Sequence, residues 1–164
     1  MPEKKLFGKK IKLCDVSAAH TYSKDISPIF SWMQDIKLSK KPIILDIGAN
    51  LGLFSLSYAA MFKEAEIHCF EPNISLAEKL KKLKNPNIFI NNLAVTNEVG
   101  EKKFFINDED QKSSFYNFAN YKSKGKEIIV KTTTIDEYCR LKNINKINLI
   151  KIDTEGAEPE ALEG

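Results

Sequence analysis

The stretch ILDIGANLGLF, residues 44–54, places an apolar run directly before two glycines and a second apolar segment. A short apolar run with β-branched residues that ends in a glycine turn is typical of a strand buried on both faces of a parallel sheet. Apolar side chains then recur at helical spacing, at Leu51, Phe54, Tyr58 and Met61. The segment therefore predicts a strand, a tight turn and a helix over residues 51–63.

The same alternation continues along the chain. EIHCF (66–70) is a second apolar strand candidate, and Asn73 is a suitable N-cap for the leucine-containing helix that follows. IFINNLAV (88–95) predicts a third strand, and KINLIKID (146–153) predicts a fourth. Strands that alternate with helices predict an α/β protein with a doubly wound, mainly parallel sheet that carries helices on both faces.

Between the third and fourth strands, residues 96–133 depart from this alternation. EKKFFI (101–106) and KEIIVKT (126–132) are typical of strands and enclose a polar stretch, so we expect a hairpin-like insertion with a loop. Thr134 and Glu137 then form a capping box, which predicts a short helix.

The length of 164 residues and an apolar fraction of 43% are enough for one domain with a buried core. We expect this domain over residues 42–164. Residues 1–41 are expected to add a strand over 10–16 and a helix over 27–36, and to pack on the domain.

Charge and cysteine content exclude several classes of protein. The formal net charge is only +3, and Arg140 is the single arginine, which disfavours a nucleic-acid surface. The three cysteines are far apart, with no CxxC pair, which disfavours a disulfide framework and structural zinc. No signal peptide or membrane span is evident, so we expect a cytoplasmic protein.

Three of the predicted strands end in acidic or glycine-containing loops, over residues 46–52, 71–73 and 153–158. Ligands of open α/β sheets bind beyond the carboxyl ends of the strands, so we expect these loops to meet at one site. Gly48 and Gly52 allow the backbone to approach a ligand closely. Glu71 follows the neighbouring strand, where an acid can accept hydrogen bonds from the hydroxyls of a ribose. Together these loops predict a nucleoside-containing ligand.

The first loop does not fit a dinucleotide. The usual pyrophosphate fingerprint G-x-G-x-x-G has Asn50 and Leu53 here at its second and third glycine positions. Asp46, two residues before Gly48, would repel a pyrophosphate but suits a cationic ligand. S-adenosylmethionine, which carries an ammonium and a sulfonium, meets this requirement.

ILDIGANLGLFSL, FEPN, NNLAV, the SSF of the insertion, TTTIDEY and INLIKIDTEGAE, in this order, resemble the FkbM family of S-adenosylmethionine-dependent methyltransferases. The resemblance implies a Rossmann-like class I methyltransferase fold and O-methylation of a sugar, polyketide or similar small molecule. It implies a cofactor loop and a ribose and adenine side that together comprise Asp46, Gly48, Asn50, Gly52, Phe54, Glu71, Pro72, Asn92, Ala94 and Val95. It also implies that three acids face the methyl-transfer side: Asp153, Glu155 and Glu158.

Methyl transfer to a hydroxyl requires mainly that the nucleophile is placed in line with the departing sulfur. Asp153 or Glu155 could accept the hydroxyl proton, or hold a divalent cation that lowers the pKa of the alcohol. These acids, with Glu158, are also common in the first turn of a helix, and Glu71 could be an ordinary helix-start acid. His68, in an apolar strand, is expected to be a core residue.

A full class I methyltransferase sheet has the strand order 3-2-1-4-5-7-6, and the sequence supplies candidates for 3-2-1-4. We therefore expect a chain truncated at its C-terminus, with an open edge at the fourth strand through which copies could self-associate. The alternative to an active methyltransferase is a non-catalytic nucleoside-binding or interaction module.

Overall fold

The computed structural model of the chain describes residues 1–6, 9–14, 35–106, 114–115 and 126–164. The predicted helix over residues 27–36 lies almost entirely outside these ranges. Within them, no helix is long and apolar enough to cross a membrane.

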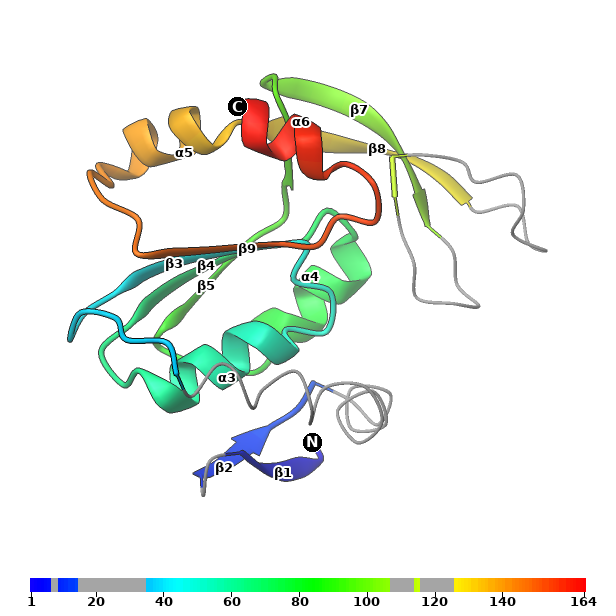
Figure 1. Cartoon of the computed structure of the whole chain (residues 1–164). Coiled ribbons are helices and arrows are strands. Elements are labelled where there is room, and N and C mark those ends of the chain that lie inside the picture. Colours follow the sequence, from blue (N-terminus) through cyan, green and yellow to red (C-terminus); the bar gives the residue numbers. More distant parts are fainter. Residues whose placement is uncertain (7–8, 15–34, 107–113, 116–125) are drawn as a thin grey trace.

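A parallel four-stranded sheet forms the centre of the molecule (Figure 1). Its strands are β3 (Ile43–Ile47), β4 (Glu66–Phe70), β5 (Ile88–Asn91) and β9 (Leu149–Ile152). Each lies within one of the four apolar runs of the sequence, and the order across the sheet is β5-β4-β3-β9. The expected α/β class with a mainly parallel sheet is therefore confirmed. In the order of the chain, the four predicted strands are arranged 3-2-1-4.

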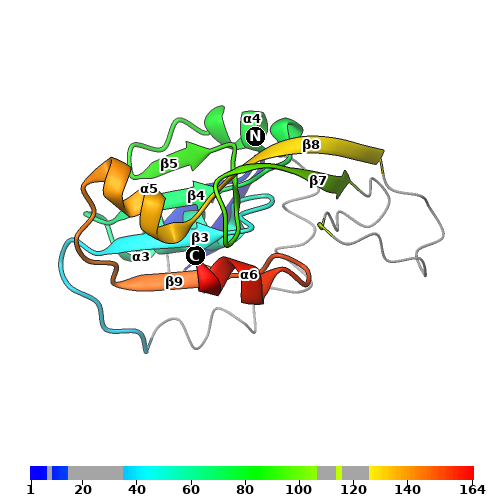
Figure 2. The ribbon, with the colours of Figure 1, turned by 90° about the horizontal axis from the view of Figure 1, so that it is seen from above.

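Helices lie on both faces of this sheet (Figures 1 and 2). α3 (Leu53–Met61) and α4 (Ile74–Lys81) cover one face, and α5 (Ile135–Lys142) covers the other. A short helix, α6 (Glu158–Glu163), follows β9 near the end of the chain. The sheet is thus the middle of three layers.

The helix ends follow from local backbone chemistry. α3 begins later than predicted because Gly52 is its N-cap, in the left-handed conformation with φ +72°. Asn73 caps α4 as predicted, and its side chain accepts a backbone hydrogen bond. Thr134 Oγ1 accepts a hydrogen bond from the backbone N–H of Glu137 at 3.0 Å. The Glu137 carboxylate, however, binds Arg140 at 2.7 Å instead of completing the predicted capping box.

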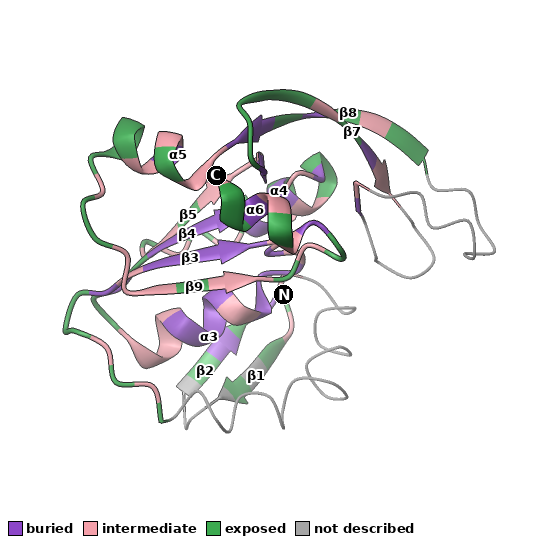
Figure 3. Cartoon of the chain, turned by 45° about the horizontal axis from the view of Figure 1, so that its top comes forward, coloured by how far each residue is buried: buried purple, intermediate pink, exposed green. Residues whose placement is uncertain are grey.

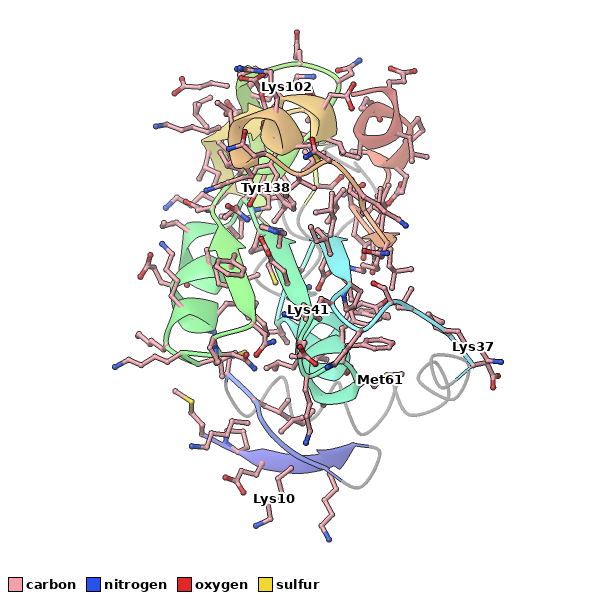
Figure 4. The ribbon with its side chains drawn as sticks, turned by 90° about the vertical axis from the view of Figure 1, so that its left-hand side faces the viewer. Lys10, Lys37, Lys41, Met61, Lys102 and Tyr138 are labelled. Atoms are coloured by element: carbon pink, nitrogen blue, oxygen red, sulfur yellow. The ribbon has the colours of Figure 1, made fainter. Side chains whose placement is uncertain are left out.

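Alternating side chains of the strands produce a core on each face of the sheet (Figure 3). Ile44 and Ile67 are buried on the α3 side, and Leu45 and Phe70 on the α5 side. Tyr138 extends from α5 toward the sheet (Figure 4) and packs edge-on against Phe70, with ring centroids 4.6 Å apart. Burial on both faces explains why β3 and β4 are continuous apolar runs.

The predicted third strand over residues 88–95 is two strands in different sheets. β5 ends at Asn91, and β6 (Ala94–Val95) begins after a break of two residues. The side-chain amides of Asn91 and Asn92 donate to carbonyls of β4 and of the loop that follows it. These bonds hold the break against β4 and the loop that follows it, and the chain then continues into the second sheet.

The second sheet contains β6, β8 (Lys126–Thr133) and β7 (Gly100–Ile106), in the order β6-β8-β7. β7 and β8 pair antiparallel, and most of the segment that joins them lies outside the described residues. Ala94, Phe104 and Val130 form its small apolar core. Figure 2 shows that β7 and β8 pass over the carboxyl ends of the central strands.

Near the N-terminus, β1 (Glu3–Leu6) and β2 (Lys9–Lys12) form an antiparallel pair (Figure 1). β2 coincides with the start of the strand predicted over residues 10–16. Ile11 and Leu13 are buried in the core on the α3 side. This short sheet therefore packs on the outside of α3.

Candidate functional site

A pocket opens at the carboxyl ends of β3, β4 and β9, where the loops after these strands meet β6 and β7. Its empty volume is about 610 Å³, including space that is open to solvent. The lining contains both polar and apolar residues. The polar and loop residues are Gly48, Asn50, Glu71, Pro72, Asp153, Thr154 and Glu155, and the apolar ones are Ile47, Phe70, Leu76, Leu93, Ala94, Val95, Phe104 and Phe115.

Glu71 is a buried carboxylate at the wall of this pocket, with 4% of its surface exposed. Its Oε2 accepts a hydrogen bond from the backbone N–H of Asn50 at 2.7 Å, and its Oε1 accepts one from that of Asn73 at 2.9 Å. Burial raises the pKa of Glu71 to about 7, against the opposing effect of these two hydrogen bonds. Glu71 therefore joins the loops after β3 and β4 while remaining at the pocket surface.

Glycine is required at the two positions of the first loop for different structural reasons. At Gly48 (φ +73°), a Cβ would lie 2.0 Å from the carbonyl oxygen of Asp153, so only glycine lets the ends of β3 and β9 approach each other. At Gly52, a Cβ would meet the side chain of Leu80 on α4. Gly48 lines the pocket, whereas Gly52 lies away from it and serves helix packing.

Asp46 is completely buried behind the pocket. Its Oδ2 accepts hydrogen bonds from the hydroxyl of Ser55 at 2.6 Å and from the backbone N–H of Ser55 at 3.1 Å. Its Oδ1 forms an ion pair with the Nζ of Lys151 at 3.1 Å. Asp46 thus has a cationic partner within the protein and does not line the pocket, which removes the sequence argument that its charge is directed at a cationic ligand.

Lys151 also contacts two neighbours of Asp46. Its Nζ donates to the carbonyl oxygen of Gly48 at 2.7 Å and lies 5.1 Å from the centroid of the Phe54 ring. Phe54, which the resemblance placed in the cofactor site, therefore packs behind the loop and does not line the pocket.

The loop after β4 is held by side-chain hydrogen bonds from the segment that follows β5. The side-chain amide of Asn92 donates to the carbonyls of Glu71 and Pro72, each at 2.8 Å. Pro72, Ala94 and Val95, which the resemblance placed in the cofactor site, line the pocket, whereas Asn92 lies outside the lining. The contacts of Asn92 support the loop that carries Glu71.

Of the three acids after β9, two reach the pocket. Asp153 and Glu155 line it, and both are exposed. Glu158 instead accepts hydrogen bonds from the backbone N–H groups of Thr154 at 2.7 Å and Gly156 at 3.0 Å. Burial acts to raise the pKa of Glu158, but these hydrogen bonds outweigh it and lower the pKa. Glu158 therefore stabilises the loop.

The insertion contributes two aromatic residues, Phe104 and Phe115, to the apolar lining of the pocket. Ser114 pairs with Phe105 through two backbone hydrogen bonds of 2.8 and 3.0 Å, and its hydroxyl donates to the carbonyl of Glu155 at 2.7 Å. The ring of Phe115 packs edge-on against Phe104, with centroids 5.4 Å apart. Ser114 therefore ties the insertion to the loop after β9 and places Phe115 at the pocket.

His68 is a core residue, as predicted. It is 3% exposed and lies outside the pocket lining, with its ring nitrogens 2.8 Å from the Tyr138 hydroxyl and 3.0 Å from a carboxylate oxygen of Glu66. Burial lowers the pKa of His68, against the opposing effect of Glu66.

Sequence reasoning missed Lys151 and the pocket residues Thr154, Phe104 and Phe115. A signal for Lys151 was available: it is a lysine within an apolar strand, and Asp46 is an acid within another. Opposite charges in two strands that are both expected to be buried indicate an ion pair. No sequence signal indicated that the insertion folds back onto the loop after β9.

Metal binding finds no support in the described part of the chain, where no group of three or more His, Cys, Asp and Glu side chains could hold an ion. The fold and the pocket define the chain as an α/β protein with an acidic pocket at the carboxyl ends of its parallel strands, where open α/β sheets bind ligands.

Comparison with known proteins identifies the family. The profile described as "Methyltransferase FkbM domain" matches residues 46–164, so the chain belongs to the FkbM methyltransferase family, as the resemblance indicated. No solved structure gives a significant match.

Two curated relatives are similar to the chain at low identity. "2-O-methyltransferase NoeI" of Sinorhizobium fredii is 24% identical over 148 residues, which cover 80% of this chain. "Methyltransferase sdnD" of Sordaria araneosa is 27% identical over 163 residues, which cover 77% of this chain. The matched region spans 61% of the length of each relative.

Proposed function

We propose that the chain binds S-adenosylmethionine in the pocket at the carboxyl ends of β3, β4 and β9, and takes part in transfer of its methyl group to a hydroxyl of a small molecule. The observation that carries this proposal is the buried carboxylate of Glu71 at the pocket wall. It lies at the end of the strand next to β3, where acids of related α/β sites bind ribose hydroxyls.

The remaining pocket residues supply complementary surfaces for such a ligand. Gly48 and Asn50 present backbone at the end of β3, suited to the methionine part. Ala94 and Val95 offer an apolar surface for the adenine. The order β5-β4-β3-β9 also agrees with strands 3-2-1-4 of the class I methyltransferase fold, to which we assign the domain.

The charge of the pocket favours a cationic ligand for a different reason than the sequence indicated. Its charged lining residues among those described are the acids Glu71, Asp153 and Glu155, whereas Asp46 is neutralised by Lys151. Carboxylates at a ligand surface attract the ammonium and sulfonium of S-adenosylmethionine. The acidic character of the site therefore rests on the loops after β4 and β9.

The sulfonium supplies an electrophilic methyl group when the cofactor is bound. The protein has to hold the acceptor hydroxyl in line with it and take up the proton that the hydroxyl loses. Asp153 and Glu155 are the exposed carboxylates at the pocket, and we assign the proton-accepting role to one of them, with Asp153 as the first candidate. Methylation of oxygen is also the activity in the name of one relative.

The test is calorimetric titration of the chain with S-adenosylmethionine and S-adenosylhomocysteine. The proposal predicts saturable binding of both, weakened in Glu71→Gln and unchanged in Glu78→Gln, a matched change of an exposed carboxylate on α4. Absence of binding to the unmodified chain would contradict the proposal.

Turnover is measured separately, with radiolabelled methyl donor and a panel of sugars and other hydroxyl compounds. Asp153→Asn should retain cofactor binding and lose methyl transfer. Unchanged transfer would remove Asp153 from the reaction. Cofactor binding without transfer to any acceptor would instead favour the alternative function, a nucleoside-binding module.

A further inference from the structure

Lys151 lies in β9 directly beside Asp46 of β3, because the register of these parallel strands pairs the two residues. The Lys151 side chain is only 12% exposed, and Asp46 is fully buried. Besides the ion pair of 3.1 Å with Asp46, its Nζ donates to the carbonyl of Gly48 at 2.7 Å and lies 3.9 Å from the carboxylate of Asp153. One ammonium group thus contacts the loops after both strands.

These contacts place Lys151 behind the pocket. Gly48 and Asp153 line the pocket, whereas Lys151 does not. The carbonyl of Asp153 lies so close to Gly48 that no residue with a side chain fits at position 48 without displacing it. The two loops are therefore in direct contact, and the ammonium group bridges them from the inner side.

A buried ion pair between two strands of a sheet is a costly way to stabilise a fold, because apolar residues of similar size are often at least as stabilising. Its value here lies in geometry: a point charge with three donors can hold a carboxylate and a carbonyl in fixed positions at once. When the loops of a site are already ordered, ligand binding costs less free energy, because the ligand does not have to order them.

We propose that Lys151 is a positioning residue of the methyl-donor site, which holds the loop of Asp46 and Gly48 against the loop of Asp153. This inference rests on the proposed function, since it assigns a role in binding S-adenosylmethionine. Lys151 acts through the loops and touches neither cofactor nor acceptor.

Lys151 also affects the charge state of Glu71. Its positive charge lowers the pKa of Glu71, whereas Asp46 raises it, and burial raises it most. The other acids at the pocket are Asp153 and Glu155, both exposed. Because ribose hydroxyls donate to an ionised carboxylate, loss of the lysine charge should move the onset of cofactor binding to higher pH.

The experiment uses Lys151→Met, the double variant Asp46→Asn with Lys151→Met, and Lys103→Met as control. Lys103 pairs with Glu127 at 2.9 Å across β7 and β8 and lies outside the pocket lining. Thermal unfolding and the Kd for S-adenosylmethionine are measured for each, at temperatures where every variant is folded.

The double variant separates stability from positioning, because it leaves neither charge unpaired. We expect the double variant to unfold at a temperature closer to that of the unmodified chain than Lys151→Met does. Its affinity for S-adenosylmethionine should nevertheless remain about tenfold or more weaker than that of the unmodified chain, as expected for misplaced binding groups. Recovery of both stability and affinity would overturn the inference and leave a purely structural ion pair.

The pH dependence of the Kd is the second readout. The pH of half-maximal affinity should shift upward in Lys151→Met and stay unchanged in Lys103→Met and in Lys151→Arg, which keeps the charge. An unchanged midpoint in Lys151→Met would contradict the inference. If the unmodified chain binds no S-adenosylmethionine at all, the proposed function fails first, and the inference fails with it.

Discussion

Asp46 and Glu71 end neighbouring strands of the same sheet, and the sequence assigned both to one ligand. The structure gives these buried carboxylates different surroundings. Asp46 faces Lys151 and Ser55 and has no surface at the pocket. Glu71 accepts hydrogen bonds from the backbone N–H groups of Asn50 and Asn73, and it lines the pocket.

The difference shows how to tell a structural acid from a ligand-binding one. A buried carboxylate with a cation at 3.1 Å is neutralised within the fold. Two backbone N–H groups only partly offset the burial of Glu71, as its pKa of about 7 shows. Glu71 is therefore the carboxylate that gains most from the hydroxyl donors of a ligand.

The largest effect is expected from Asp46→Ala. This change leaves the ammonium of Lys151 buried without its carboxylate, and breaking a buried ion pair from one side costs about 3–5 kcal/mol. The free energy of unfolding, measured in urea, should fall by that amount. Asp136→Ala, a matched change of an exposed acid on α5, should alter it little. Equal effects of the two changes would contradict the structural role of Asp46.

Glu71 should make the stability depend on pH. Its pKa in the fold, about 7, is above the ordinary value of 4.5, so folding favours the protonated form. The stabilising effect is complete below pH 4.5 and is lost as the pH rises through 7, a change of about 3 kcal/mol at 1.36 kcal/mol per pKa unit.

The measurement compares the unfolding free energy of the unmodified chain with that of Glu71→Gln from pH 4 to pH 8. The difference between the two should change across this range, because glutamine does not titrate. A constant difference would show that the pKa of Glu71 is not raised.

Much of the fold followed from the sequence because its determinants are local. Four apolar runs gave the strands of the parallel sheet, and Asn73 gave the start of α4. The break at Asn91 and Asn92 was missed because it depends on side-chain amides that bond to a different strand, a contact between residues far apart in the chain.

The site was predictable only in part, for the same reason. The sequence predicted that the three loops meet, and in the structure Gly48, Glu71 and Asp153 line one pocket. It could not separate pocket residues from those that support them. Glu158 and Asp153 look alike in the sequence. The structure distinguishes them, because Glu158 accepts hydrogen bonds from backbone N–H groups of its own loop, whereas Asp153 lines the pocket.

The two glycines test the same comparison between pocket residues and supporting residues, with a smaller expected effect. Gly48→Ala and Gly52→Ala each place a side chain in the left-handed region, with φ +73° and +72°, and this backbone conformation alone costs about 1–3 kcal/mol. Only Gly48 also contacts Asp153, so only Gly48→Ala should weaken binding of S-adenosylmethionine, measured by titration. Equal loss of affinity would contradict this distinction.

The smallest effect is expected from Glu158→Gln. The amide retains one acceptor oxygen for the backbone N–H groups of Thr154 and Gly156, so stability should fall by about 1 kcal/mol, as for loss of a helix cap. Methyl transfer should remain close to that of the unmodified chain, measured beside Asp153→Asn. A loss as large as that of Asp153→Asn would return Glu158 to the catalytic residues.

The most direct test of the central claim is a crystal structure of the chain with S-adenosylhomocysteine. The account predicts that the ligand occupies the pocket at the carboxyl ends of β3, β4 and β9, with ribose hydroxyls within hydrogen-bond distance of Glu71 and with Asp46 still paired to Lys151. A ligand bound elsewhere, or one that contacts Asp46 while Glu71 stays at a distance, would contradict it.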